Sequence, residues 1–212
     1  MGTGGRPRTF EPEVALDAAV ETFWRHGYES TGLTELTEAM GISRPALYRA
    51  FGDKAQLFRA ALERYIDRNM GYVEAALARP SAREVAEAFL TGNAEAVTTP
   101  GRPPGCLSVQ AMVTHEAEAF SLLTENRKVI QKRLSARFRH AIIDGDLPPN
   151  EDPEDLARFM ITLTTGFAIR AADGEPRQAL VALARRALTV FPAPDPASHD
   201  RRARSHSERH NP

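Results

Sequence analysis

The sequence predicts an all-α protein with a small N-terminal domain and a larger helical domain behind it. Apolar residues recur at helical spacing through most of the chain, glycine or proline separates the apolar segments, and no segment carries a strand signal. With 212 residues, of which 42% are hydrophobic, the chain can bury a sizeable core. We expect about nine helices, with the small domain at residues 10–52 and the larger one at residues 53–191.

The first expected helix lies in the segment ALDAAVETFWRHGYEST. Its apolar side is formed by Leu16, Ala19, Val20 and Phe23, and it closes at Gly27 and Tyr28. Such a one-sided apolar stripe is typical of a helix that packs against neighbours on one face.

Two short helices joined by a glycine turn follow, at residues 33–40 and 44–51. Thr31 is expected to cap the first of them, and Gly41 tolerates the left-handed backbone with which a helix ends. Ser43 is expected to cap the second helix, and Pro45 stands in its first turn, where a missing N–H costs nothing. Two short helices with a tight turn are the pattern of a DNA-binding helix-turn-helix.

The second short helix carries chemistry suited to DNA. Leu47 and Phe51 would face its neighbours, and the other side would be free. The free side is formed by Arg44, Pro45, Ala46, Tyr48 and Arg49, near the end that such helices insert into the major groove. Arginine pairs with guanine edges, small apolar groups contact thymine methyls, and a tyrosine hydroxyl can reach a phosphate. The alternative is an ordinary surface hairpin with solvated charges.

The flanking residues favour DNA binding, because residues 16–65 resemble the N-terminal domain of the TetR/AcrR family of transcriptional regulators. The matching residues are Gly27, Tyr28, Gly41, Pro45, Leu47, Tyr48, Phe51, Asp53 and Lys54. The resemblance implies a three-helix DNA-binding domain and a variable helical domain that binds an effector and dimerises.

Site residues follow from the same resemblance. It implies base contacts by Thr34, Arg44, Pro45 and Ala46, and phosphate contacts by Thr31, Tyr48 and Lys54. Lys54 would also lie in the first turn of the next helix, where the dipole favours an anion. Together with Ser43 and Arg49, these residues make up the expected DNA-binding set.

The larger domain is expected to be helical throughout. A helix capped by Asp53 should run to residue 78, and Ser81 should cap another that ends before TTPGRPPG. A short helix should start near Cys106, and a long one near Ala117. After the turn DGDLPPNEDP, two last helices are expected at residues 153–172 and 175–191.

The last two helices are more apolar than a small domain can bury alone, which predicts a dimer interface that forms a four-helix bundle. The family that the chain resembles also dimerises through its last two helices. The expected interface residues are Leu156, Phe159, Leu163, Gly166, Leu180, Leu183, Ala184 and Leu188. The alternative is that these residues close the core of their own domain.

A small apolar effector is expected to bind among aromatic and sulfur-containing residues of the middle helices. The candidate pocket residues are Phe89, Cys106, Met112, His115, Phe120, Phe138, Met160 and Phe167. Ordinary core packing is the alternative. The segment PPGCLSVQA also resembles the turn entering the sixth helix in a subgroup of the family, some of whose members sense electrophiles or oxidants through a cysteine there. An electrophile- or redox-sensing repressor that acts through Cys106 is therefore an alternative.

Composition and missing motifs narrow the function classes. A formal net charge of -1 does not suit a general nucleic-acid binder, whereas a sequence-specific repressor needs only a local positive edge. No glycine-rich phosphate loop, paired metal motif or nucleophile elbow is present, so we expect no enzyme, cofactor or metal. A helical adaptor without DNA binding is a further alternative.

The ends of the chain, its lack of long apolar runs and its cysteine content complete the expectations. No run of about eighteen apolar residues and no signal peptide is present, and a single cysteine rules out an internal disulfide. We therefore expect a cytoplasmic protein without a membrane partner. Residues 1–9 are expected to form a flexible basic arm, and residues 192–212 a disordered tail.

Overall fold

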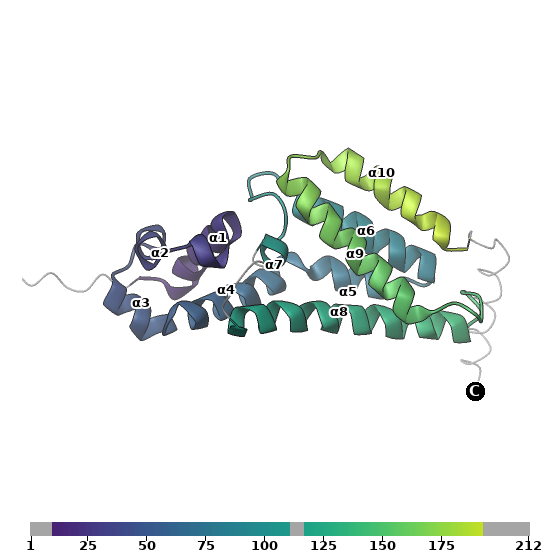
Figure 1. The fold of residues 1–212 in the computed structure, drawn as a ribbon, viewed down its shortest axis with the longest axis horizontal. Helices are drawn as coiled ribbons and strands as arrows, with labels where there is room; N and C mark the ends of the chain where they lie inside the picture. The colour runs from purple at the N-terminus through teal and green to yellow at the C-terminus, as the bar shows by residue number, and fades with distance from the viewer. Residues whose placement is uncertain (1–9, 111–116, 193–212) are drawn as a thin grey trace, which may run out of the picture.

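The structure, a computed structural model, describes residues 10–110 and 117–192, with side chains described from residue 120 onward in the second range. Within these ranges every regular element is a helix, which confirms the predicted all-α class. The molecule is elongated, with a small helical domain at one end and a larger layered one at the other (Figure 1). In this part of the chain, none of the helices combines the length and apolar character that crossing a membrane requires.

The small domain is formed by α1 (Pro12–Ser30), α2 (Leu33–Met40) and α3 (Arg44–Phe51), and α4 (Lys54–Asn69) leads from it into the larger one. The larger domain contains α5 (Gly71–Leu77), α6 (Ala82–Val97), α7 (Leu107–Gln110), α8 (Ala117–Ile143), α9 (Pro153–Ala172), α10 (Arg177–Ala187) and the short 3-10 helix η1 (Leu188–Val190). The described residues thus hold ten α-helices, where the sequence predicted about nine. The domain division at residues 52 and 53 stays a prediction.

The extra helix arises at Met70, where the predicted helix over residues 53–78 breaks. Met70 has φ -108° and ψ 15°, so it lies outside the helical region, and α5 starts at Gly71. The side chain of Asn69 donates to the Tyr65 carbonyl at 2.9 Å, so it competes for a carbonyl at the end of α4. Helix α5 then packs closely on α6, because Gly92 has no side chain: a Cβ there would lie 2.7 Å from Cβ of Tyr72.

Local chemistry sets most helix ends as the sequence predicted. Gly41 adopts the left-handed conformation at φ 67° after α2, and the Ser43 hydroxyl accepts from the Ala46 N–H at the start of α3. Asp53 and Ser81 each form a full capping box, before α4 and α6 respectively.

The ends of two other helices differ from prediction. Thr31 is not the N-cap of α2, since Gly32 occupies that position and makes no side-chain cap. The predicted last helix over residues 175–191 is shorter, because Pro176 is the N-cap of α10 and the chain tightens into η1 at Leu188.

An aromatic cluster joins the small domain to α4. The Phe23 and Phe58 rings lie 5.1 Å apart at 81°, and the Tyr28 and Phe58 rings lie 5.0 Å apart at 70°. Such edge-to-face pairs add to the free energy gained by burying the rings. Gly27, with φ 74°, interrupts α1 just before Tyr28, so the last turn of α1 is offset from the rest of the helix.

Ion pairs reinforce the same packing at the other end of α4. Arg64 binds Asp17 and Glu13 of α1, and Arg68 binds Asp17 as well. Hydrogen bonding by Arg64, then by Arg68, lowers the pKa of Asp17 below its ordinary value of 3.8, although partial burial opposes the change. A carboxylate with a lowered pKa stabilises the fold above its unfolded pKa, and this stability is lost as the pH falls through the folded pKa.

We expect Asp17→Asn to lower the free energy of unfolding at pH 7 by about 1 kcal/mol. The difference should shrink as the pH falls below 3.8 and through the lower folded pKa, because Asp17 is then protonated in the wild type as well. Urea unfolding at pH 7 and at about pH 3 measures both values. The control is Asp67→Asn at an exposed position of α4. A difference that stays the same at both pH values would contradict the role given to the Asp17 charge.

Candidate nucleic-acid interface

Helix α3 has a buried side and an open side at one end of the molecule (Figure 1). Leu47 is fully buried at 0% exposure, whereas Arg44 and Pro45 are exposed and Tyr48 is 50% exposed. Arg49 is exposed as well, and Ala46 is partly buried. The helix is eight residues long and depends on this buried side for stability.

Arg44 and Thr34 contact each other across the turn between α2 and α3. Arg44 Nη2 donates a hydrogen bond to Thr34 Oγ1 at 3.0 Å. This bond holds the guanidinium beside α2 and leaves its other N–H groups without a partner among the described residues. The sequence predicted a separate base contact for each of these two residues, but in the chain without DNA they are hydrogen-bonded to each other.

Lys54 lies at the start of α4, the helix that follows α3. Its Nζ lies 4.3 Å from the centroid of the Tyr28 ring, a cation-π contact. The backbone N–H groups and the dipole of the first turn of α4 add positive potential at this place. The edge formed by Arg44, Tyr48 and Lys54 therefore combines hydrogen-bond donors with fixed positive charge.

Thr31 does not belong to this edge, and its predicted phosphate contact is wrong for this conformation. Its side chain is 0% exposed, and its hydroxyl donates to the Gly27 carbonyl at 2.6 Å. The hydroxyl supports the interruption of α1 at Gly27 instead, where it satisfies a carbonyl left open by the non-helical backbone.

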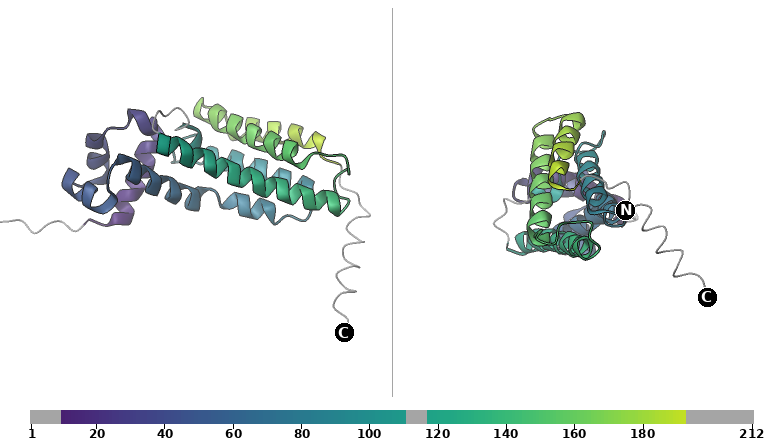
Figure 2. Two further views of the ribbon diagram at one scale, coloured as in Figure 1. Left: turned by 60° about the horizontal axis from the view of Figure 1, so that its bottom comes forward. Right: turned by 90° about the vertical axis from the view of Figure 1, so that its right-hand side faces the viewer.

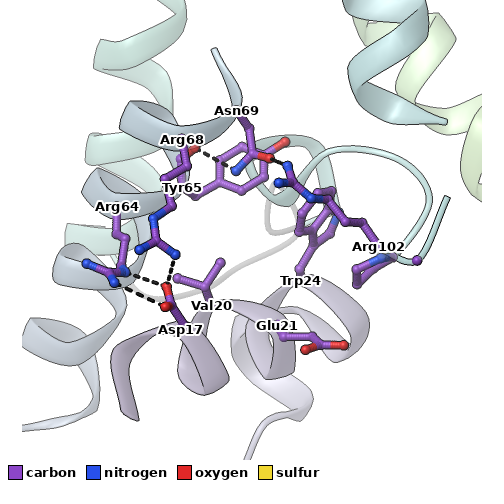
Figure 3. A pocket seen from close by; sticks show the side chains of 11 residues that line it. Asp17, Val20, Glu21, Trp24, Arg64, Tyr65, Arg68, Asn69 and Arg102 are labelled. Atoms are coloured by element: carbon purple, nitrogen blue, oxygen red, sulfur yellow. Dashed lines mark hydrogen bonds and ion pairs between the residues drawn. The ribbon is translucent and has the colours of Figure 1, made fainter. Parts of the chain in front are cut away.

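A cavity of about 270 Å³ lies where the small domain meets the larger one, between α1, α4 and the loop before α7 (Figure 3). Its charged groups have partners: Asp17 binds Arg64 and Arg68, Glu21 binds Arg25 on the same helix, and Arg102 donates to Asn69. The arrangement connects the loop to α4 and leaves little unsatisfied charge for a ligand.

A second, smaller cavity of about 40 Å³ lies inside the larger domain, among α5, α6, α7, α8 and α9. Phe89 and Cys106, two of the expected pocket residues, line it. Cys106 is 9% exposed; its Sγ accepts from the Tyr65 hydroxyl at 3.3 Å and lies 3.0 Å from the Ser108 hydroxyl. Burial, then the neighbouring Cys106, raises the pKa of Tyr65 well above its ordinary value.

Other expected pocket residues lie elsewhere. Phe120 is exposed, Phe138 packs against Phe191 with ring centroids 5.7 Å apart, and Met160 and Phe167 are core residues that line neither cavity. Met112 and His115 lie outside the described residues, as do the expected basic arm and all of the expected tail except residue 192.

Sequence reasoning missed the polar residues of the smaller cavity. Tyr72, Asn93, Ser108 and Arg127 line it together with Phe89 and Cys106. Asn93 offered a signal, because it stands between apolar neighbours on the buried side of α6.

The expected dimer residues divide into two groups. Leu156, Leu180, Ala184 and Leu188 are buried within the single chain, so assigning them to a second subunit was wrong: α10 packs on α6, and the helices close their own core. The other four, Phe159, Leu163, Gly166 and Leu183, are partly or fully exposed.

A free, cationic recognition helix on a three-helix domain, followed by a larger helical domain with an internal cavity, defines a helix-turn-helix regulator. Residues 15–61 match the family model of bacterial regulatory proteins, tetR family. Residues 105–191 match that of the BetI-type transcriptional repressor, C-terminal. The chain belongs to the TetR family of transcriptional regulators, which confirms the resemblance seen in the sequence.

Individual relatives agree with this assignment. The chain is 34% identical to the HTH-type transcriptional repressor ComR of Escherichia coli K12 over 89% of its own length and 92% of that protein. It is 28% identical to the repressor BdcR of the same organism over 85% and 88%. A cysteine variant of the regulator CifR, solved in complex with a 26-base-pair operator DNA, is 39% identical, with a TM-score of 0.82 and coverage of 89% of this chain and 100% of that one.

We expect Arg44→Ala to weaken operator binding by about 1–3 kcal/mol per half-site, the usual contribution of the base contact that the sequence predicts for Arg44. Tyr48→Phe should cost about 1 kcal/mol, the usual net contribution of one hydrogen bond. Fluorescence anisotropy with labelled operator measures both. Arg133→Ala is the matched control, since it removes one positive charge from α8, where Arg133 pairs with Glu74. Wild-type affinity in both α3 variants would contradict the interface.

Proposed function

We propose that this chain is a homodimeric transcriptional repressor that binds a pseudo-palindromic operator and leaves it when a small molecule enters the larger domain. The open edge of α3, with Arg44 held in place by Thr34, is the observation that carries the proposal. The complex of the similar CifR chain with operator DNA supports it. Repression is favoured because a dimer bound at a promoter excludes polymerase, and ComR and BdcR are named repressors.

The proposed DNA contacts follow the exposed edge. Arg44, Pro45 and Ala46 would meet base edges, and Ser43, Tyr48, Arg49 and Lys54 would meet the phosphates. Thr34 would contribute to DNA binding indirectly, because its hydroxyl accepts the hydrogen bond that holds the Arg44 guanidinium in place. The net charge of -1 suits sequence-specific binding, because a nearly neutral chain has only a weak non-specific attraction to DNA.

The outer face of α9, α10 and η1 is the proposed dimer surface. Both long helices pack on α6 and run beside each other along the larger domain (Figure 2). Ile169 and Val190 are 50% exposed there, and Leu183 is 44% exposed. Apart from its own helix, none of the described residues has an atom within 4 Å of a Cβ placed on Gly166, so a second helix has room to approach. An apolar face of this kind is costly to leave in water.

The double variant Ile169→Glu and Leu183→Glu should be monomeric, because two charges on each subunit would be buried at the interface. Operator affinity should fall at least about a hundredfold, since each monomer reads only one half-site. Sedimentation equilibrium gives the oligomeric state, and anisotropy gives the affinity.

Ile143→Glu is the matched control for the dimer variant. Ile143 is 75% exposed at the end of α8, outside the proposed surface, so this substitution should leave both measurements unchanged. A double variant that remains dimeric would place the interface elsewhere.

A connected set of contacts supports coupling between the small cavity and the DNA-binding domain. The Tyr65 hydroxyl on α4 donates to Cys106 at the cavity, and the Tyr65 ring packs on the Trp24 ring of α1 at 4.8 Å and 83°. A ligand that displaces Cys106 would alter this contact and so tilt α4 and α1 relative to the larger domain. By this mechanism the two recognition helices would lose the spacing that the operator requires.

Two alternatives have less support. A sensor that acts through Cys106 needs an accessible thiol, and this one is buried and hydrogen-bonded. An adaptor without DNA binding has no use for Arg44, Tyr48 and Lys54 on one edge. In the function we propose, the protein is a cytoplasmic regulator and not an enzyme.

A further inference from the structure

Arg127 is a cation of the small cavity that has no carboxylate partner among the described side chains. It is partly buried on α8, where Nη1 donates to the Ser108 carbonyl at 3.4 Å and Nη2 to the Thr124 hydroxyl at 3.3 Å. No carboxylate forms an ion pair with it among the described residues, whereas Arg64, another partly buried arginine, has two. Burial lowers the pKa of Arg127, as expected for a charge without full compensation.

Asn93 provides an independent observation on another wall of the same cavity. Its side chain is 6% exposed, and its Nδ2 donates to the Tyr72 hydroxyl at 3.0 Å. Its Oδ1 is buried and accepts no hydrogen bond in the described part of the chain. Buried polar atoms are normally paired, so this acceptor calls for a donor from outside the protein.

Together the two residues specify complementary groups on a ligand. Arg127 requires an anion, for which a carboxylate has the matching geometry, and Asn93 Oδ1 requires a hydroxyl or amine hydrogen. The volume of about 40 Å³ takes about three water-sized groups, so a ligand that reaches both residues must be short.

We propose that the effector of this regulator is a short hydroxycarboxylic acid, with its carboxylate on Arg127 and its hydroxyl on Asn93. This replaces the apolar effector that the sequence suggested. The identity of the effector rests on the proposed function, but the binding site itself does not.

Calorimetric titration of the full chain with glycolate, lactate and 3-hydroxybutyrate tests the site. At least one of them should bind, propionate should bind about tenfold more weakly because it lacks the hydroxyl, and propane-1,2-diol should not bind because it lacks the charge. Arg127→Gln should weaken binding at least about tenfold. Glutamine can still donate to the neighbours of Arg127, so the fold should be kept. Arg133→Ala on the same helix is the control and should bind as the wild type does.

Operator release separates this proposal from the proposed function. The acid that binds should release wild-type protein from the operator and leave Arg127→Gln bound. If calorimetry shows binding but no DNA is bound in any state, the repressor function is wrong while the site stands. The site is overturned if none of the three acids binds, if Arg127→Gln binds them as well as wild type, or if the diol binds equally.

Discussion

The DNA-binding end of this protein depends on the packing of α1 against α4. Helices α2 and α3 have eight residues each, too few to be stable in water by themselves. They keep their shape because Leu36 and Leu47 are buried against that pair of longer helices, and the rings of Phe23 and Phe58 hold the pair together. Any change that separates α1 from α4 would therefore also remove the recognition helix from its place.

Helix α4 is also the physical connection to the larger domain. Its first turn carries Lys54 at the proposed DNA edge, and its last turns carry Arg64 and Tyr65 toward α1 and the cavity. Its length, from Lys54–Asn69, lets one rigid element contact both regions. A small shift at the cavity would thus become a change in the position of α3.

Sequence signals that act within a few residues predicted the fold well. Ser43, Asp53 and Ser81 cap helices where expected, since a cap depends only on the next three residues. The break at Met70 was missed although Asn69 and Gly71 flank it, because the apolar pattern continues across these residues and packing of α5 on α6 contributes to the break.

The candidate site was predicted only in part, because several of its features depend on contacts between residues far apart in the sequence. The outward face of α3 followed from the helical pattern, whereas the burial of Thr31 depends on a break in α1 that the pattern does not show. The apolar stripes of α9 and α10 could not tell a partner subunit from α6, because both bury the same kind of side chain. That Arg127 lacks a carboxylate partner in the described part of the chain could not be predicted either, because it depends on where the acidic residues of other helices lie.

In the proposed function, two copies of α3 read one DNA site as a symmetric pair. Selection of bound sequences from random double-stranded DNA with the purified full chain tests it most directly. We expect an enriched pseudo-palindrome, with two inverted half-sites whose centres lie a whole number of helical turns apart. Enrichment of no sequence, or of a single half-site without its inverted copy, would contradict it.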